Sequence, residues 1–175
     1  DGKSMKDNLI GNISKSLIIE DRADFFYKKV LFPHVQEYRK NYHGDPIRPH
    51  VYGKVDMVLN GFWVNYQYQH EFNPYHHHGG IYSFVVWLKI PYDWKEQHNL
   101  PFMEGIKDSD RKASDFEFEY CDLLGDIRNH SFQLDKSMEG RMLFFPAGLR
   151  HAVYPFYNCE EPRISVAGNV WFKTK

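Results

Sequence analysis

Residues 73–80 read Asn73-Pro74-Tyr75-His76-His77-His78-Gly79-Gly80 and lead directly into an apolar run at residues 81–91. Imidazole is the side chain most often used to bind transition metals at neutral pH. In an extended segment, residues two apart point to the same side. We therefore expect His76 and His78 to face one side together, as two metal ligands that need a third from elsewhere, with His77 turned away.

The composition is that of one globular domain, and we expect a single domain over residues 1–175. The chain has 22 basic and 23 acidic residues and a formal net charge of -1, which gives no support to a nucleic-acid-binding or membrane-binding protein. Cys121 and Cys159 have no metal-site spacing and make no disulfide framework. With no secretory signal or membrane-length apolar run, we expect a soluble cytoplasmic protein.

Hydrophobic periodicity divides the chain into a helical part and a strand-rich part. Apolar residues recur at helical intervals after residue 22, which predicts a helical region over residues 20–45, kinked or broken at Pro33. An apolar group at residues 17–19 is a candidate edge strand. Runs rich in aromatic and β-branched residues predict further strands at residues 61–68, 81–90, 127–134, 140–145, 151–156 and 163–172.

Residues 92–126 are charged and aperiodic, and we expect an insertion there, either a lid over a functional site or a solvated loop. One helical region followed by about seven short strands predicts a mainly β fold, a sandwich or a jelly-roll barrel. Its strand-rich core would span residues 55–172, and the 17% aromatic content suits such a fold.

His151 is the candidate third ligand. The other histidines outside the cluster lie in polar sequence, whereas His151 begins a predicted strand after a glycine turn and precedes alternating apolar residues. A jelly roll can bring an early and a late strand side by side. His76, His78 and His151 would then form a facial set of three nitrogen ligands that leaves open positions on a six-coordinate metal.

Arg163 and Ser165 form a candidate anion site at the start of the last predicted strand, where alternation places them on one face. A guanidinium offers a planar fork of donors and stays charged, so it suits a carboxylate. A metal site near an anion site suggests a small dicarboxylate that bridges both. Each feature alone is common without a function, and the prediction rests on their joint occurrence in this order.

Three segments of the chain resemble those of Fe(II)- and 2-oxoglutarate-dependent oxygenases. They are Pro74-Tyr75-His76-His77-His78 with the strand after Ser83, Gly140-Arg141-Met142-Leu143-Phe144-Phe145-Pro146 with His151-Ala152-Val153-Tyr154-Pro155, and Arg163-Ile164-Ser165-Val166. Within the family, the chain resembles small oxygenases of marine phages and bacteria that are related to prolyl hydroxylases. The similarity covers residues 55–172, with the insertion unmatched, and it implies the cytoplasm of a bacterium or a phage-infected host cell.

The resemblance implies a double-stranded β-helix, the cupin-like jelly roll, with the N-terminal helical region packed on it and Fe(II) bound. His76 would be the first ligand and His151 the distal ligand. Arg163, helped by Ser165, would bind the far carboxylate of 2-oxoglutarate. In the family, O₂ oxidatively decarboxylates 2-oxoglutarate to succinate and CO₂ while an unactivated C–H bond is hydroxylated.

The sequence departs from the family at His78, where most members have an acidic residue. Replacing a carboxylate by a neutral imidazole removes a negative charge and should weaken Fe(II) binding. We expect a working three-histidine iron site, because His78 has the spacing of the ligand. The alternatives are a carboxylate recruited from elsewhere, with Glu71 nearest in sequence, and a site that has lost its chemistry.

Trp87 and Asn65 are further candidates for the co-substrate pocket. Trp87 shares a strand face with Ser83 and Val85, where relatives often place a co-substrate tyrosine, so it would either wall the pocket or belong to the core. Asn65 shares a strand face with Trp63 and could also line the cavity.

The sequence therefore predicts a 2-oxoglutarate-dependent dioxygenase that hydroxylates a small-molecule or peptide substrate, with a peptidyl proline as one candidate. Two alternatives stay open. One is a cupin-like three-histidine metalloenzyme that does not use 2-oxoglutarate, and the other is a non-catalytic β-sandwich that only binds its ligand.

Overall fold

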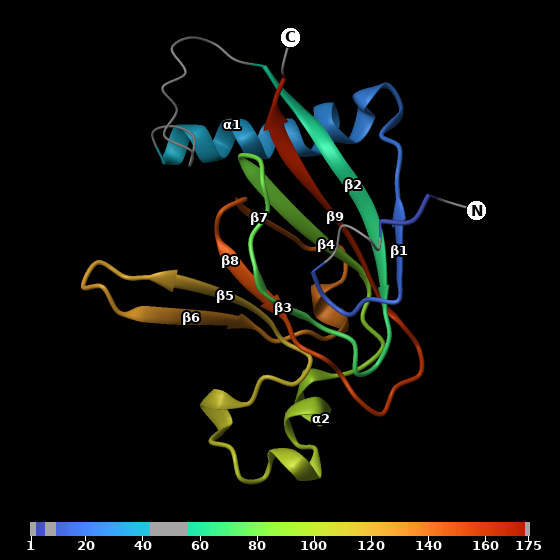
Figure 1. Ribbon diagram of the computed structural model, residues 1–175, viewed down its shortest axis with the longest axis vertical. Helices are drawn as coiled ribbons and strands as arrows, with labels where there is room; N and C mark the ends of the chain where they lie inside the picture. Colours follow the sequence, from blue (N-terminus) through green and yellow to red (C-terminus); the bar gives the residue numbers. More distant parts are fainter. Residues whose placement is uncertain (1–2, 6–9, 43–55, 174–175) are drawn as a thin grey trace.

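The computed structural model describes residues 3–5, 10–42 and 56–173, and it consists mainly of two antiparallel sheets (Figure 1). The larger sheet has the strand order β1 (Lys15–Ile18), β2 (Met57–Gln67), β9 (Arg163–Phe172), β4 (Tyr82–Lys89), β7 (Met142–Pro146). The smaller has the order β3 (Asn73–His76), β8 (Arg150–Val153), β5 (Phe116–Cys121), β6 (Ile127–Phe132). From β2 onward the chain crosses repeatedly between the sheets, so the predicted double-stranded β-helix is confirmed.

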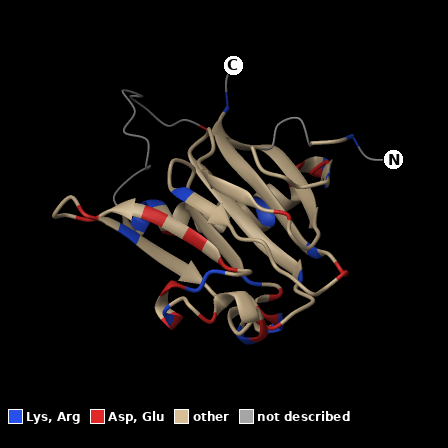
Figure 2. Ribbon diagram, turned by 60° about the horizontal axis from the view of Figure 1, so that its bottom comes forward, with Lys and Arg blue, Asp and Glu red and all other residues tan. Residues whose placement is uncertain are grey.

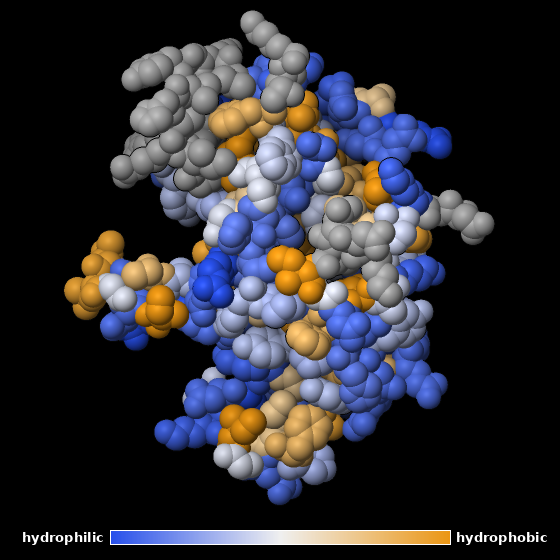
Figure 3. All heavy atoms as spheres, in the orientation of Figure 1, coloured by the Kyte–Doolittle hydropathy of each residue, from blue (hydrophilic) through white to orange (hydrophobic). Residues whose placement is uncertain are grey.

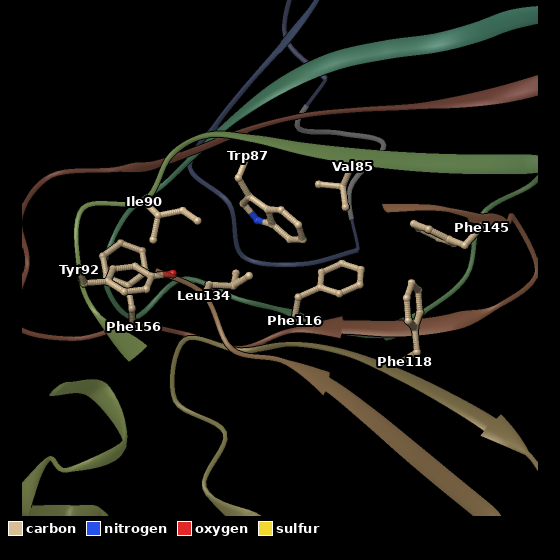
Figure 4. Close-up of a cluster of buried hydrophobic side chains, with 9 residues drawn as sticks. All are labelled: Val85, Trp87, Ile90, Tyr92, Phe116, Phe118, Leu134, Phe145 and Phe156. Atoms are coloured by element: carbon tan, nitrogen blue, oxygen red, sulfur yellow. The ribbon is translucent and has the colours of Figure 1, made fainter. Parts of the chain in front are cut away.

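Strand β4 shows why the apolar run at residues 81–91 forms the centre of the fold. It pairs with β9 on one side and β7 on the other, and both of its faces are covered. Val85 and Trp87 point between the sheets toward Phe116 and Phe145 (Figure 4). Phe84 points the other way, into a second cluster under the N-terminal helix. A strand buried on both faces needs a nearly continuous apolar sequence.

The predicted N-terminal helical region is present. It comprises a 3-10 turn at Arg22–Asp24, a π-helical segment at Tyr27–Leu31 and α1 at Phe32–Asn41. Pro33 stands in the first turn of α1, directly after the π-helical segment. Proline has no N–H and its ring crowds the carbonyl four residues earlier, which explains the irregular ladder at this point. Residues 43–45 of the expected region lie outside the described residues.

The prediction of an insertion over residues 92–126 is wrong in part. Residues 92–115 do leave the sheets as expected, and we call this segment the excursion. It contains a short helix α2 (Trp94–His98) and 3-10 turns at Pro101–Met103 and Asp108–Asp110. Residues 116–121, however, form β5, which pairs with both β8 and β6. The acidic residues along this strand (Figure 2) hide the alternation, because Glu117 is as fully buried as the phenylalanines beside it.

Glu117 is buried inside a polar network on the face of the small sheet opposite the core. Its carboxylate accepts hydrogen bonds from Tyr75, Asn129 and Ser131 and pairs with Lys112. Burial alone would raise the pKa of Glu117, but these hydrogen bonds outweigh burial and hold it at about 2. The network therefore stabilises an ionised carboxylate that fastens the excursion at residues 92–115 to the sheet.

The β5–β6 hairpin projects from the body of the molecule, and its tip is apolar (Figure 3). Leu123, Leu124 and Ile127 are all strongly exposed there. Among the described residues, no helix is long and apolar enough to cross a membrane.

The Gly79–Gly80 turn joins the histidine cluster to β4, and its backbone lies too close to β9 for larger side chains. His78 N–H donates to the Ala147 carbonyl at 2.9 Å. Gly80 has φ +100°, and a Cβ at this position would lie 2.8 Å from the Val170 carbonyl oxygen. Glycine is therefore required by both conformation and space.

We expect Gly80→Ala to lower the free energy of unfolding by about 1–3 kcal/mol, because alanine is strained at this φ and its methyl group clashes with β9. Urea unfolding would measure the loss. The matched control is Gly148→Ala, since nothing lies within 4 Å of a Cβ built there. Equal stability of the two variants would contradict the argument.

Candidate metal centre

Three imidazoles meet where β3 and β8 lie side by side. His76 is the last residue of β3 and is directly opposite His151 of β8, while His78 comes from the following loop. The ring centroids are 4.3 Å apart for His76 and His151, and 5.0 Å apart for His78 and either partner. One nitrogen from each ring lies within 4.8 Å of the others. His77 is exposed, as expected for a residue on the opposite side.

Hydrogen bonds to backbone carbonyls set the tautomer of two of these rings. His76 Nδ1 donates to the Pro74 carbonyl at 2.7 Å, and His151 Nδ1 donates to the Leu149 carbonyl at 3.0 Å. A carbonyl only accepts, so the proton must be on Nδ1 and the lone pair on Nε2. This is the arrangement in which an outer hydrogen bond orients a histidine toward a metal.

Burial keeps the three rings neutral at physiological pH. It lowers the pKa of His76, and it lowers the pKa of His78 to about 4 and that of His151 to about 3, with neighbouring histidines adding to the effect on all three. A metal binds the neutral form of imidazole. At pH 7 the three rings are therefore already in the neutral form that binds a metal.

No carboxylate of the described residues joins the three imidazoles. Glu71, the nearest acidic candidate in sequence, accepts hydrogen bonds from the backbone N–H groups of Ser14 and Tyr68, at 3.0 and 2.9 Å. Its two oxygens are thus used to fix the turn after β2. The donor set is three neutral nitrogens, which suits Fe(II) among other transition metals.

Arg163, the first residue of β9, is 2% exposed and is held by neutral groups. Its Nη1 donates to the Tyr92 hydroxyl and to the Ser114 carbonyl, and its Nη2 donates to Gln67 Oε1 at 2.6 Å and to the Tyr154 carbonyl at 3.2 Å. Among the described residues, no carboxylate forms an ion pair with this guanidinium. A buried charge without a counter-ion is costly, so the arrangement favours an anionic ligand.

The structure brings all seven residues singled out in the sequence to one cavity between the sheets. It is lined by His76, His78, His151, Arg163, Ser165, Trp87 and Asn65, and also by Trp63, Gln67, Phe116 and Phe145 among others. Trp87 was expected either to wall the pocket or to belong to the core, and it does both. It lines the cavity and packs edge-on against Phe116 in the core. Asn65 accepts a hydrogen bond from Ser16 at 2.8 Å, which anchors it to β1.

Sequence reasoning missed the two side chains that accept hydrogen bonds from Arg163, those of Gln67 and Tyr92. Gln67 is 4% exposed and lies two residues beyond Asn65 on β2, so strand alternation could have placed it on the same face. Tyr92 follows β4 and Pro91 in irregular sequence, and no local pattern indicates that its hydroxyl reaches Arg163.

We expect the metal-free protein to lose more stability between pH 7 and pH 5 than the His151→Gln variant does, by about 1–2 kcal/mol. The unfolded chain protonates its histidines near the ordinary pKa of 6.5, whereas the folded state holds the pKa of His151 at about 3. The free energy of unfolding therefore falls as the pH drops below 6.5.

Denaturant unfolding in the presence of a chelator, at both pH values, would measure this difference. Titrating groups outside the histidine cluster cancel in the comparison, including Asp115, whose pKa burial raises to about 6. A wild-type loss no larger than that of the variant would show that His151 protonates freely in the folded state.

Comparison with known proteins identifies relatives by sequence and by fold. The model of the family described as "Putative 2OG-Fe(II) oxygenase" matches residues 61–169. No curated protein sequence is significantly similar to the chain.

Two solved structures match most of the chain. The viral collagen prolyl hydroxylase of Paramecium Bursaria Chlorella virus-1, in its 2OG complex, is 13% identical with a TM-score of 0.54, over 95% of this chain and 84% of that one. A Pseudomonas putida prolyl-4-hydroxylase is 14% identical with a TM-score of 0.50, over 93% and 74%. This chain also matches 47% of a 2OG-Fe(II) oxygenase family oxidoreductase from Burkholderia pseudomallei, with 69% of this chain covered, 13% identity and a TM-score of 0.45.

The structural likenesses support the double-stranded β-helix, and the family model covers most of its strands. The chain belongs to the 2OG-Fe(II) oxygenase family, oxidoreductases whose metal is Fe(II) and whose co-substrate is 2-oxoglutarate.

Proposed function

We propose that this chain is a 2-oxoglutarate-dependent dioxygenase that hydroxylates a C–H bond of a small-molecule or peptide substrate. His76, His78 and His151 bind the iron, and Arg163 binds the far carboxylate of 2-oxoglutarate. One observation carries the proposal. A single cavity is lined both by three neutral imidazoles with converging nitrogens and by a buried guanidinium that no described carboxylate neutralises.

The imidazole group fits Fe(II) in its chemistry. Its nitrogens converge, two of its rings are oriented by carbonyls, and nitrogen ligands are common in iron sites. When bound, the metal with 2-oxoglutarate and O₂ supplies the oxidation in which 2-oxoglutarate, O₂ and R–H become succinate, CO₂ and R–OH. The protein's own contribution is to orient the reactants and to keep water from the reacting atoms, for which the aromatic walls of the cavity are suited.

The Arg163 end offers a carboxylate a positive charge whose position is fixed before any ligand arrives, because protein acceptors hold both Nη groups. Gln67 and Tyr92 hold the guanidinium from β2 and from the segment after β4. Tyr92 is outside the residues that line the cavity and helps to position the guanidinium by accepting its hydrogen bond. Ser165 lines the cavity from the same strand as Arg163 and can add a hydroxyl. A preorganised cation binds an anion without a large ordering cost.

The substrate that we propose to test first is a peptidyl proline. Two structures with the same fold are described as prolyl hydroxylases, one viral and one bacterial. A proline-containing peptide is therefore a first probe for hydroxylation, and free amino acids or other small molecules are the next class to try.

The three-histidine set also suits Zn(II), which would serve a metalloenzyme that does not use 2-oxoglutarate. The two functions differ in a simple binding experiment. Binding of 2-oxoglutarate that depends on Fe(II) supports the dioxygenase, whereas tight Zn(II) binding without any 2-oxoglutarate binding supports the alternative.

We expect His151→Ala to abolish Fe(II) binding, because it removes the most buried of the three imidazoles. Anaerobic calorimetric titration with Fe(II) measures the affinity, and the rise of the melting temperature on metal addition reports binding to the native state. His77→Ala is the matched control, since the exposed His77 is adjacent in sequence but outside the group. Retained Fe(II) affinity in His151→Ala would remove this residue from the ligand set.

We expect Arg163→Met to weaken 2-oxoglutarate binding by about 30-fold or more, while Fe(II) binding changes little. Succinate formation from 2-oxoglutarate should fall in parallel. Arg150→Met is the control, because Arg150 is an exposed arginine on β8 that pairs with Glu119. If Arg163→Met lost the metal and kept 2-oxoglutarate, the two ends of the cavity would have to be assigned the other way round.

A further inference from the structure

Two residues that line the cavity have a buried polar atom with no hydrogen-bond partner among the described residues, Trp63 and Asn73, and of these atoms only the indole N–H of Trp63 is a donor. Trp63 is 3% exposed, and its Nε1 has no hydrogen-bond partner among the described residues. A buried donor without an acceptor loses the hydrogen bond it would make to water, which is a real cost to folding. Such a group in a ligand cavity indicates that a ligand supplies the acceptor.

Trp63 lies beside the metal centre. It is on β2 and lines the same cavity, and its ring centroid is 5.9 Å from that of His78. A Cβ built on Gly61 would lie 3.4 Å from Cζ3 of the indole. That atom belongs to the edge of the ring opposite Nε1, so the N–H edge is turned away from Gly61.

The same face of β2 continues toward the anion site. Strand alternation places Trp63, Asn65 and Gln67 on one face, and all three line the cavity. Gln67 is bonded to Arg163. The polar groups of this strand therefore extend from the imidazoles to the guanidinium. A ligand that contacts both ends of the cavity would lie along this face of β2.

We propose that Trp63 binds the co-substrate by donating its Nε1–H to an oxygen at the metal-binding end of a 2-oxo dicarboxylate. This inference rests on the proposed function, because it takes 2-oxoglutarate as the occupant of the cavity. The oxo acid end carries an anionic carboxylate and a keto oxygen, both of which accept hydrogen bonds. Trp63 packs beside His78, one of the proposed iron ligands, so an oxygen held at the metal is the acceptor that we expect this donor to reach.

An aromatic wall of this cavity needs no polar atom in order to pack. Phe116 and Phe145 line it with rings that have no polar atom. A wall at position 63 that served packing alone would need no donor either. Trp63→Phe removes the N–H and keeps an aromatic ring on the wall, so it separates the hydrogen bond from the packing.

The test is calorimetric titration of 2-oxoglutarate into Mn(II)-loaded protein without O₂, so that binding is read without turnover. We expect Trp63→Phe to bind 2-oxoglutarate about tenfold more weakly, while its affinity for Mn(II) stays within about twofold of wild type. Trp94→Phe is the matched control, because it removes an indole N–H from α2, outside the residues that line the cavity.

The outcomes separate this inference from the proposed function. If wild type binds Mn(II) but no 2-oxoglutarate, the proposed function fails. If wild type binds 2-oxoglutarate and Trp63→Phe binds it equally well, only the Trp63 role is overturned. An equal loss of Mn(II) affinity in the variant would also overturn it, because Trp63 would then act through His78.

Discussion

The buried charge of Arg163 is the constraint on which the rest of the structure depends. Its guanidinium joins β9 to β2 through Gln67, to the segment after β4 through Tyr92, and to the chain flanking β5 and β8 through Ser114 and Tyr154. One side chain therefore ties the two sheets together. Taking a cation out of water costs several kcal/mol, and neutral partners recover only part of that cost. The remaining charge favours an anion over a neutral or cationic ligand in the cavity.

The sequence predicted the parts of the site that lie on regular strands. β9 runs over the predicted residues, so Arg163 and Ser165 share a face, and β8 carries His151 to a position opposite His76. Alternation in β2 also contained the signal for Gln67. In these cases the period of two and the apolar pattern decide where a side chain points.

The rest could not be predicted because tertiary contacts override the local pattern. β5 lacks a visible alternation, since Glu117 is buried by partners that come from β3, β6 and the excursion at residues 92–115. β3 has only four residues and includes Pro74. Tyr92 reaches Arg163 from irregular sequence. A buried polar contact depends on both partners, and one stretch of sequence contains only one of them.

The three-histidine donor set changes how charge is balanced in the cavity. A carboxylate ligand would neutralise part of the charge of a divalent metal, whereas the proposed ligands His76, His78 and His151 would leave all of it in place. Arg163 adds a further positive charge at the other end, and no described carboxylate joins either group. A dianionic co-substrate then becomes the main counter-charge for both. In a cavity lined largely by aromatic and apolar side chains, charges interact strongly, so on the proposed assignment the metal and 2-oxoglutarate would each favour binding of the other. If His78 is a ligand, as proposed, an imidazole in place of the carboxylate expected from the family resemblance gives a site whose charge is balanced by its co-substrate.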